Sequence, residues 1–72
     1  MSTDDSADYK NYELHDETWR KHGLSAPARK ALVNAGIFHE KHLQMHTLDE
    51  LQQLHGIGKK ALEQLEAILA QL

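Results

Sequence analysis

The segment of residues 54–60, LHGIGKK, combines residue types suited to binding an anion. It contains two glycines and two lysines, which are Gly56, Gly58, Lys59 and Lys60. The glycines can adopt positive φ and let the backbone approach another surface, while Ile57 can pack between the flanking helices. The lysines fall where the next helix would begin, and a helix dipole disfavours cations there unless an anion binds. We therefore predict a hairpin between two helices that binds phosphate, most simply that of a nucleic acid.

A purely structural explanation of the same segment stays open. A tight turn between two helices needs glycine whether or not a ligand binds, so Gly56 and Gly58 alone do not indicate a site. The turn does not need Lys59 and Lys60, and their presence favours the phosphate interpretation.

Three of the six histidines have a spacing that could bind a metal ion. His39, His42 and His46 lie at i, i+3 and i+7, and the last two have the spacing of paired helical ligands. Thr47 is the expected cap of the next helix, so the helix that carries the histidines should end before His46 shares its face. No cysteine or carboxylate pair completes the set, and we predict no metal site and no cofactor. The histidines can still become cationic in mild acid.

The sequence gives no indication of an enzyme. No base stands at a recognisable spacing from Ser6 or Ser25, and Asp49-Glu50 fits the start of a helix better than an acid–base pair. A chain of 72 residues is at most one small domain, without room for a deep substrate pocket. We predict a binding protein without catalytic activity.

The net charge of −3 is unevenly distributed along the chain. Residues 1–23 hold six acidic and three basic side chains, whereas residues 24–72 hold five of each. A neutral core binds nucleic acid only where its cations cluster, and then in a salt-sensitive manner. No apolar run approaches the roughly 20 residues that span a membrane, and the acidic N-terminus does not resemble a signal peptide. We expect a monomeric cytoplasmic protein that does not bind membranes.

Four short helices are expected to position these groups. In the first, Ser25 is a good N-cap, Pro27 is tolerated in the first turn, and Gly36 can end the helix in the left-handed conformation. Its apolar stripe consists of Ala28, Ala31, Leu32 and Ala35. Arg29 and Lys30 lie off this stripe and are expected to face solvent or a ligand.

Three further helices follow in the prediction. A short one is expected near residues 39–45, Thr47 and Glu50 fit a capping box at the start of the next, and the last follows the glycine hairpin. The side chains expected in the core are Ile37, Phe38, Leu43, Leu48, Leu51, Leu54, Leu62, Leu65, Ile68, Leu69 and Leu72. We predict an all-α fold, a compact bundle of four to five short helices arranged as two helix-hairpin-helix-like units.

Composition divides the chain into three segments. Residues 1–11 are polar and acidic and are expected to be a disordered tail, which could also fold back over the basic hairpin. Residues 12–23 have a mixed pattern and are expected to pack, partly ordered, on the domain of residues 24–72. Trp19 in this segment either packs on the outside of the core or anchors a protein partner.

Residues 24–72, about two-thirds of the chain, resemble the C-terminal domain of the bacterial RNA polymerase alpha subunit and, more widely, helix-hairpin-helix modules. The resemblance rests on Leu24-Ser25, Ala35-Gly36-Ile37, Thr47-x-x-Glu50-Leu51 and above all Gly56-Ile57-Gly58-Lys59-Lys60-Ala61-Leu62. It implies that the hairpin backbone and its lysines contact DNA phosphates. The similar sterile-alpha-motif fold serves in protein interactions, so the fold alone does not decide the function.

One position departs from the family. The resemblance implies a minor-groove arginine near the start of the first helix, where this chain has Pro27, so the preference for A/T-rich grooves does not carry over. We predict weak, salt-sensitive binding of double-stranded DNA with little sequence specificity. The residues expected at this interface are Gly56, Ile57, Gly58, Lys59, Lys60, Arg29 and Lys30. The alternative is a protein-interaction module in transcription or DNA repair, which docks through Trp19 and the acidic tail.

Overall fold

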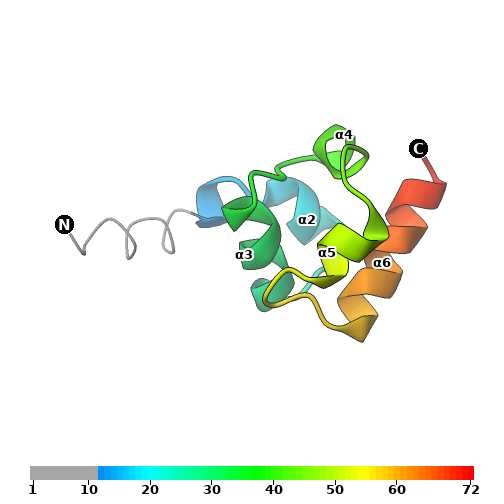
Figure 1. Cartoon of the computed structure of the whole chain (residues 1–72). Helices are drawn as coiled ribbons and strands as arrows, with labels where there is room; N and C mark the ends of the chain where they lie inside the picture. Colours follow the sequence, from blue (N-terminus) through cyan, green and yellow to red (C-terminus); the bar gives the residue numbers. More distant parts are fainter. Residues whose placement is uncertain (1–11) are drawn as a thin grey trace.

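The computed structural model describes residues 12–72, and Figure 1 shows that this part of the chain folds from helices alone. The elements are a 3-10 helix η1 (Tyr12–Leu14) and the α-helices α2 (Glu17–Lys21), α3 (Ala26–Asn34), α4 (Glu40–Leu43), α5 (Leu48–Gln52) and α6 (Lys59–Ala70). The prediction of an all-α bundle of short helices is confirmed for the described residues. The predictions for residues 1–11, disorder and a tail that covers the hairpin, lie outside them.

Helix α3 begins and ends where its sequence predicts. Ser25 is its N-cap, and Gly36 after its last turn has a φ of +79°. The N–H of Gly36 donates to the carbonyl of Val33, and the N–H of Ile37 to that of Leu32, both at 2.9 Å. These two bonds form a Schellman motif, which stops the helix and directs Ile37 into the core.

The same motif ends α2. Gly23 also has a φ of +79°, and the N–H groups of Gly23 and Leu24 donate to the carbonyls of Arg20 and Trp19. The mixed segment predicted from the sequence ends at residue 23, in agreement with this turn, but the helix before it was not predicted. A 3-10 turn and a helix of five residues are too short to show a helical period.

The capping box at the start of α5 is confirmed. The Thr47 hydroxyl accepts the Glu50 N–H at 3.1 Å, and the Glu50 carboxylate accepts the Thr47 N–H at 2.8 Å. Helix α4 is shorter than the expected residues 39–45, and it buries Leu43 completely.

The helices surround one hydrophobic core. Its buried members are Trp19, Leu24, Ala28, Ala31, Leu32, Ile37, Leu43, Leu51, Ile57, Ala61, Leu65 and Ile68. Three side chains that were expected to pack in the core lie outside it. Ala35 and Leu72 are exposed, and Phe38 is 37% exposed. Phe38 is exposed because Ile37, directly before it, takes the position that points into the core after the Schellman turn.

Trp19 lies inside the core rather than on its outside. Its side chain is completely buried, and its Nε1–H donates to the carbonyl of Ile37 at 2.8 Å. A buried indole with its one donor satisfied cannot reach the surface of a partner. The hypothesis of Trp19 as a partner anchor is therefore corrected: this residue joins α2 to the turn after α3.

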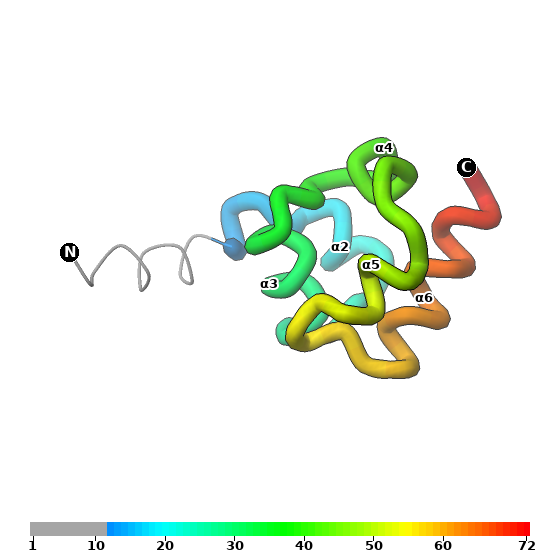
Figure 2. Tube along the Cα trace, in the orientation of Figure 1, coloured from blue at the N-terminus to red at the C-terminus, as the bar shows by residue number. Residues whose placement is uncertain are grey.

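Helix α6 is the longest element and contacts both α4 and α5. Figure 2 shows the chain leaving α5, reversing in the hairpin and entering α6, with the hairpin beside the start of α3 and far from α4. Among the described residues, no helix combines the length and the apolar character needed to cross a membrane.

Candidate functional site

The hairpin of residues 54–58 turns on one glycine in the positive-φ region. Gly56 has a φ of +107°, and the turn is closed by a hydrogen bond from the Ile57 N–H to the Leu54 carbonyl at 3.1 Å. Ile57 is buried and Leu54 is half-buried against the core. Ile57 therefore fills the apolar position predicted for it between the helices.

Gly56 also brings the hairpin into close contact with α3. A Cβ atom at this position would lie 2.7 Å from the Pro27 carbonyl oxygen and 3.3 Å from the Ala31 Cβ. The backbone of α3 cannot move aside without breaking its helix, so both the conformation and the packing require glycine here. The structural explanation of Gly56 is thus sufficient, and this glycine needs no ligand to account for it.

Gly58 has neither requirement. Its φ is −90° and ψ is −175°, an extended conformation open to any residue, and a Cβ would meet nothing within 4 Å. It is the N-cap of α6, where glycine provides no side chain to accept the first N–H groups of the helix. Gly58, Lys59 and Lys60 are all exposed, and the backbone N–H groups of Lys59 and Lys60 donate no hydrogen bond to the described residues.

The two hairpin lysines have no partner anion in the part of the chain that the structure describes. Neither Lys59 nor Lys60 forms an ion pair with any residue in the described part of the chain, and the first turn of α6 contains no acidic side chain. A cation at this end of a helix opposes the helix dipole, which makes the turn a favourable place for an anion.

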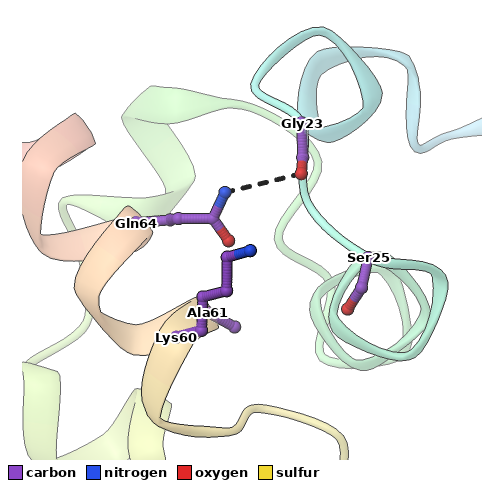
Figure 3. Close-up of a pocket in the computed structure, with 5 residues that line it drawn as sticks. All are labelled: Gly23, Ser25, Lys60, Ala61 and Gln64. Carbon is purple, nitrogen blue, oxygen red and sulfur yellow. Dashed lines mark hydrogen bonds between the residues drawn. The ribbon is translucent and has the colours of Figure 1, made fainter.

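Lys60 extends into a shallow pocket that sequence reasoning did not predict (Figure 3). Gly23, Ser25, Lys60, Ala61 and Gln64 line its volume of about 140 Å³. On one side the Gln64 amide donates to the Gly23 carbonyl at 3.4 Å. Ser25, on the other side, is the N-cap of α3, and its hydroxyl makes no capping hydrogen bond. The pocket therefore places an ammonium group between the starts of α3 and α6.

Lys59 lies at the edge of a second, larger hollow on the α5 side of the hairpin. Its lining residues are Gln52, Gln53, Ile57, Gly58, Lys59 and Leu62, and its volume is about 370 Å³. The side chains of Ile57 and Leu62 contribute apolar surface there. The two lysines thus border hollows of different character, a small one toward α3 and an open, partly apolar one toward α5.

Arg29 does not belong to this surface. Its Nε donates to the Asp16 carboxylate at 2.8 Å, its NH1 group donates to the Leu24 carbonyl at 2.6 Å, and its side chain is only 20% exposed. The expectation that Arg29 faces solvent or a ligand is therefore wrong. Lys30 is half-buried, with its Nζ 5.4 Å from the centre of the Tyr12 ring, so it packs on η1.

The structure brings together three charged side chains whose contact the sequence did not predict. We call Asp16, Arg20 and Arg29 the Asp16 cluster. Asp16 is completely buried beneath the two arginines and accepts hydrogen bonds from both. Burial raises the pKa of the Asp16 carboxyl, but the two guanidinium groups outweigh it and hold that pKa below its ordinary value. The i, i+4 spacing of Asp16 and Arg20 was the available signal. The pairing with Arg29 depends on tertiary structure.

The histidines with the expected metal spacing do not converge. The rings of His39 and His42 stack with centroids 3.7 Å apart, and His46 lies beside Glu50 instead. Within residues 12–72, no three His, Asp or Glu side chains come together as metal ligands.

Comparison of the chain with protein-family models, with curated proteins and with solved structures found no match.

Proposed function

We propose that this protein is a non-catalytic DNA-binding module that holds the phosphates of double-stranded DNA at the start of α6. One observation carries the proposal. Gly58, Lys59 and Lys60 present backbone N–H groups and two cations that have no ion-pair partner within residues 12–72, at a helix end that disfavours cations in the absence of an anion. Folding alone accounts for Gly56 but leaves these three residues unexplained.

The arrangement suits phosphate contacts rather than base reading. Exposed N–H groups and ammonium groups bind phosphate oxygens whatever the base sequence. The pocket beside Lys60 offers a second position, with the Ser25 hydroxyl across from the ammonium group (Figure 3). Arg29, which was expected to support this interface, binds Asp16 instead. The proposed interface therefore consists of lysines and backbone, and little sequence specificity is expected.

The resemblance of residues 24–72 to the C-terminal domain of the bacterial RNA polymerase alpha subunit supports the same proposal. A role in transcription would follow from it. Arg29 binds Asp16 and is no longer proposed to contact DNA, and Pro27 stands where the family has an arginine. The residues proposed to bind DNA are therefore Gly58, Lys59 and Lys60, which the turn at Gly56 positions.

The test is an NMR titration of the isotope-labelled protein with a short DNA duplex at low salt, with a Lys59→Glu/Lys60→Glu variant beside it. Binding should shift the amides of residues 56–61, and the variant should lose at least about tenfold in affinity while its helical circular dichroism is unchanged. Lys41→Glu/Lys21→Glu is the matched control, since both lysines are exposed and lie outside the hairpin. Equal affinity of the folded hairpin variant would refute the site.

A protein-interaction module remains the second candidate, favoured by the exposed apolar side chains. Leu14 is 74% exposed and Met45 is 79% exposed, and the hollow beside Lys59 includes Ile57 and Leu62. Salt dependence separates the two functions. Phosphate binding should weaken steeply between about 50 and 200 mM salt, whereas an apolar contact should not.

A further inference from the structure

Histidine rings gather around α4, on the opposite side of the fold from the glycine hairpin. The rings of His39 and His42 stack with centroids 3.7 Å apart. The Phe38 ring lies 5.8 Å from that of His42 and 5.1 Å from that of His15. Neither the DNA-binding proposal nor the core explains so many titratable rings around a helix of four residues.

Two contacts in this group require neutral imidazole. The Phe38 N–H donates to Nδ1 of His42 at 3.2 Å, and Nδ1 can accept only while it carries no proton. Protonation of both His39 and His42 would also place two cations in stacked rings. The hydrogen bond is therefore lost when His42 becomes cationic, and the stacked pair becomes repulsive when His39 is charged as well.

Two other contacts become stronger when imidazole is protonated. Nε2 of His22 lies 3.0 Å from the Glu40 carboxylate, and Nδ1 of His46 lies 3.6 Å from that of Glu50. The hydrogen bond with His22 lowers the pKa of Glu40, so Glu40 stays ionised in mild acid. These pairs attach the two ends of the α4 segment to α2 and α5.

The remaining charged groups near α4 do not compensate His39 and His42. Lys41 on α4 is itself a cation. The positive charge of Lys21 on α2 helps to lower the pKa of Glu40, and the His15 ring contacts the Phe38 ring. The acidic residues of α6, Glu63 and Glu66, form no ion pair with any described residue of the α4 segment. Within residues 12–72, no carboxylate forms an ion pair with His39 or His42 that would hold the stacked rings together once they are charged.

We propose that residues 38–46 form a pH-sensitive segment, in which mild acid breaks the His42 contacts while it strengthens the existing pairs His22–Glu40 and His46–Glu50. The change is confined at both ends. Ile37 is held by the Trp19 indole, and Thr47 is held by its capping box. The rearrangement therefore affects the segment between these two fixed points and follows the protonation of its imidazole rings.

Amide hydrogen exchange and NMR shifts of the isotope-labelled protein, followed from about pH 7.5 to about pH 5, test this proposal. The Phe38 amide should lose about fivefold in protection after correction for the intrinsic exchange rate. The pH midpoint of this loss should equal the midpoint of the chemical-shift change of the His42 ring. Amides in the middle of α6, such as that of Leu65, should keep theirs. A Phe38 amide that ignores pH, or a parallel loss throughout α6, would overturn the proposal.

Variants separate the His42 contact from general acid effects. His42→Phe keeps an aromatic ring but cannot titrate, so the Phe38 amide should become insensitive to pH. His39→Gln keeps the hydrogen bond and removes one cation, so the Phe38 transition should move to higher pH. His55→Gln, in the hairpin, is the control and should leave the transition in place. If the pH transition of the Phe38 amide is unchanged in both His42→Phe and His39→Gln, the proposed role of His42 is refuted.

Discussion

The Asp16 cluster and the glycine hairpin both place cations beside the start of a helix, but only the cluster provides an anion for them. Asp16 is the N-cap of α2 and binds Arg20 and Arg29. The hairpin starts α6 with Lys59 and Lys60, and neither has an ion-pair partner among the described residues. Positive side chains thus stabilise the fold in the Asp16 cluster, whereas those of the hairpin are available to bind a ligand.

The difference has an energetic consequence. In the cluster, two guanidinium groups satisfy one buried carboxylate and join η1, α2 and α3, since Arg20 also binds the Glu13 carbonyl at 3.1 Å. In the hairpin, each lysine opposes the dipole of α6 and forms no ion pair with the part of the chain that the structure describes. Removal of charge should therefore destabilise the first region and stabilise the second.

The largest expected effect is that of Asp16→Asn. Because it leaves two arginines beside a neutral amide, we expect a loss of about 3 kcal/mol in the free energy of unfolding near pH 7, measured by urea denaturation. This is most of the stability of a domain of this size. Glu13→Gln, which makes the same charge change on an exposed side chain, should alter stability by less than about 0.5 kcal/mol.

The same variant gives a pH dependence with a defined sign. The folded-state pKa of Asp16 is lowered, so its contribution is present above the unfolded-state pKa near 4 and is lost as the pH falls through the folded-state value. The difference between wild type and Asp16→Asn should therefore stay constant down to about pH 5 and shrink as the pH falls further toward about pH 3. A difference that stays constant would show that the carboxylate charge is not what stabilises the cluster.

The two hairpin glycines give an intermediate effect that sharpens the comparison. Gly56→Ala should cost about 2 kcal/mol, because it combines a positive φ with a Cβ contact of 2.7 Å to the Pro27 carbonyl. Gly58→Ala should cost less than about 1 kcal/mol in thermal or urea unfolding, since its conformation and surroundings admit a side chain. Equal losses would mean that both glycines serve the turn, and the argument for an open helix start would fail.

Local signals in the sequence predicted much of this fold. Gly36 as a helix stop, the Thr47–Glu50 capping box and the apolar face of α6 depend on neighbours within a few residues, and all three are confirmed. Ile37 and Ile57 were also placed in the core correctly. Elements shorter than two turns, such as α2, leave too little periodicity to be found.

What the sequence could not give depends on contacts between distant residues. Trp19 meets the Ile37 carbonyl 18 positions away, and Arg29 meets Asp16 across 13 positions. Arg29 therefore looked like a surface cation on its own helix, although tertiary structure gives it a buried partner. The hairpin lysines could be singled out because their helix start is local, but the pocket between Lys60 and Ser25 could not.

The smallest expected effect has the opposite sign from the first. Lys59→Gln and Lys60→Gln should each raise the free energy of unfolding by about 0.3–1 kcal/mol at low salt, because a cation is removed from the positive end of α6. Lys41→Gln is the matched control, since Lys41 lies in the last turn of α4, where a cation is favourable, and its removal should lower stability slightly. Added salt should diminish both effects. If the hairpin variants instead lose more than about 1 kcal/mol, their lysines stabilise the folded protein as the arginines of the Asp16 cluster do, and they no longer indicate a ligand.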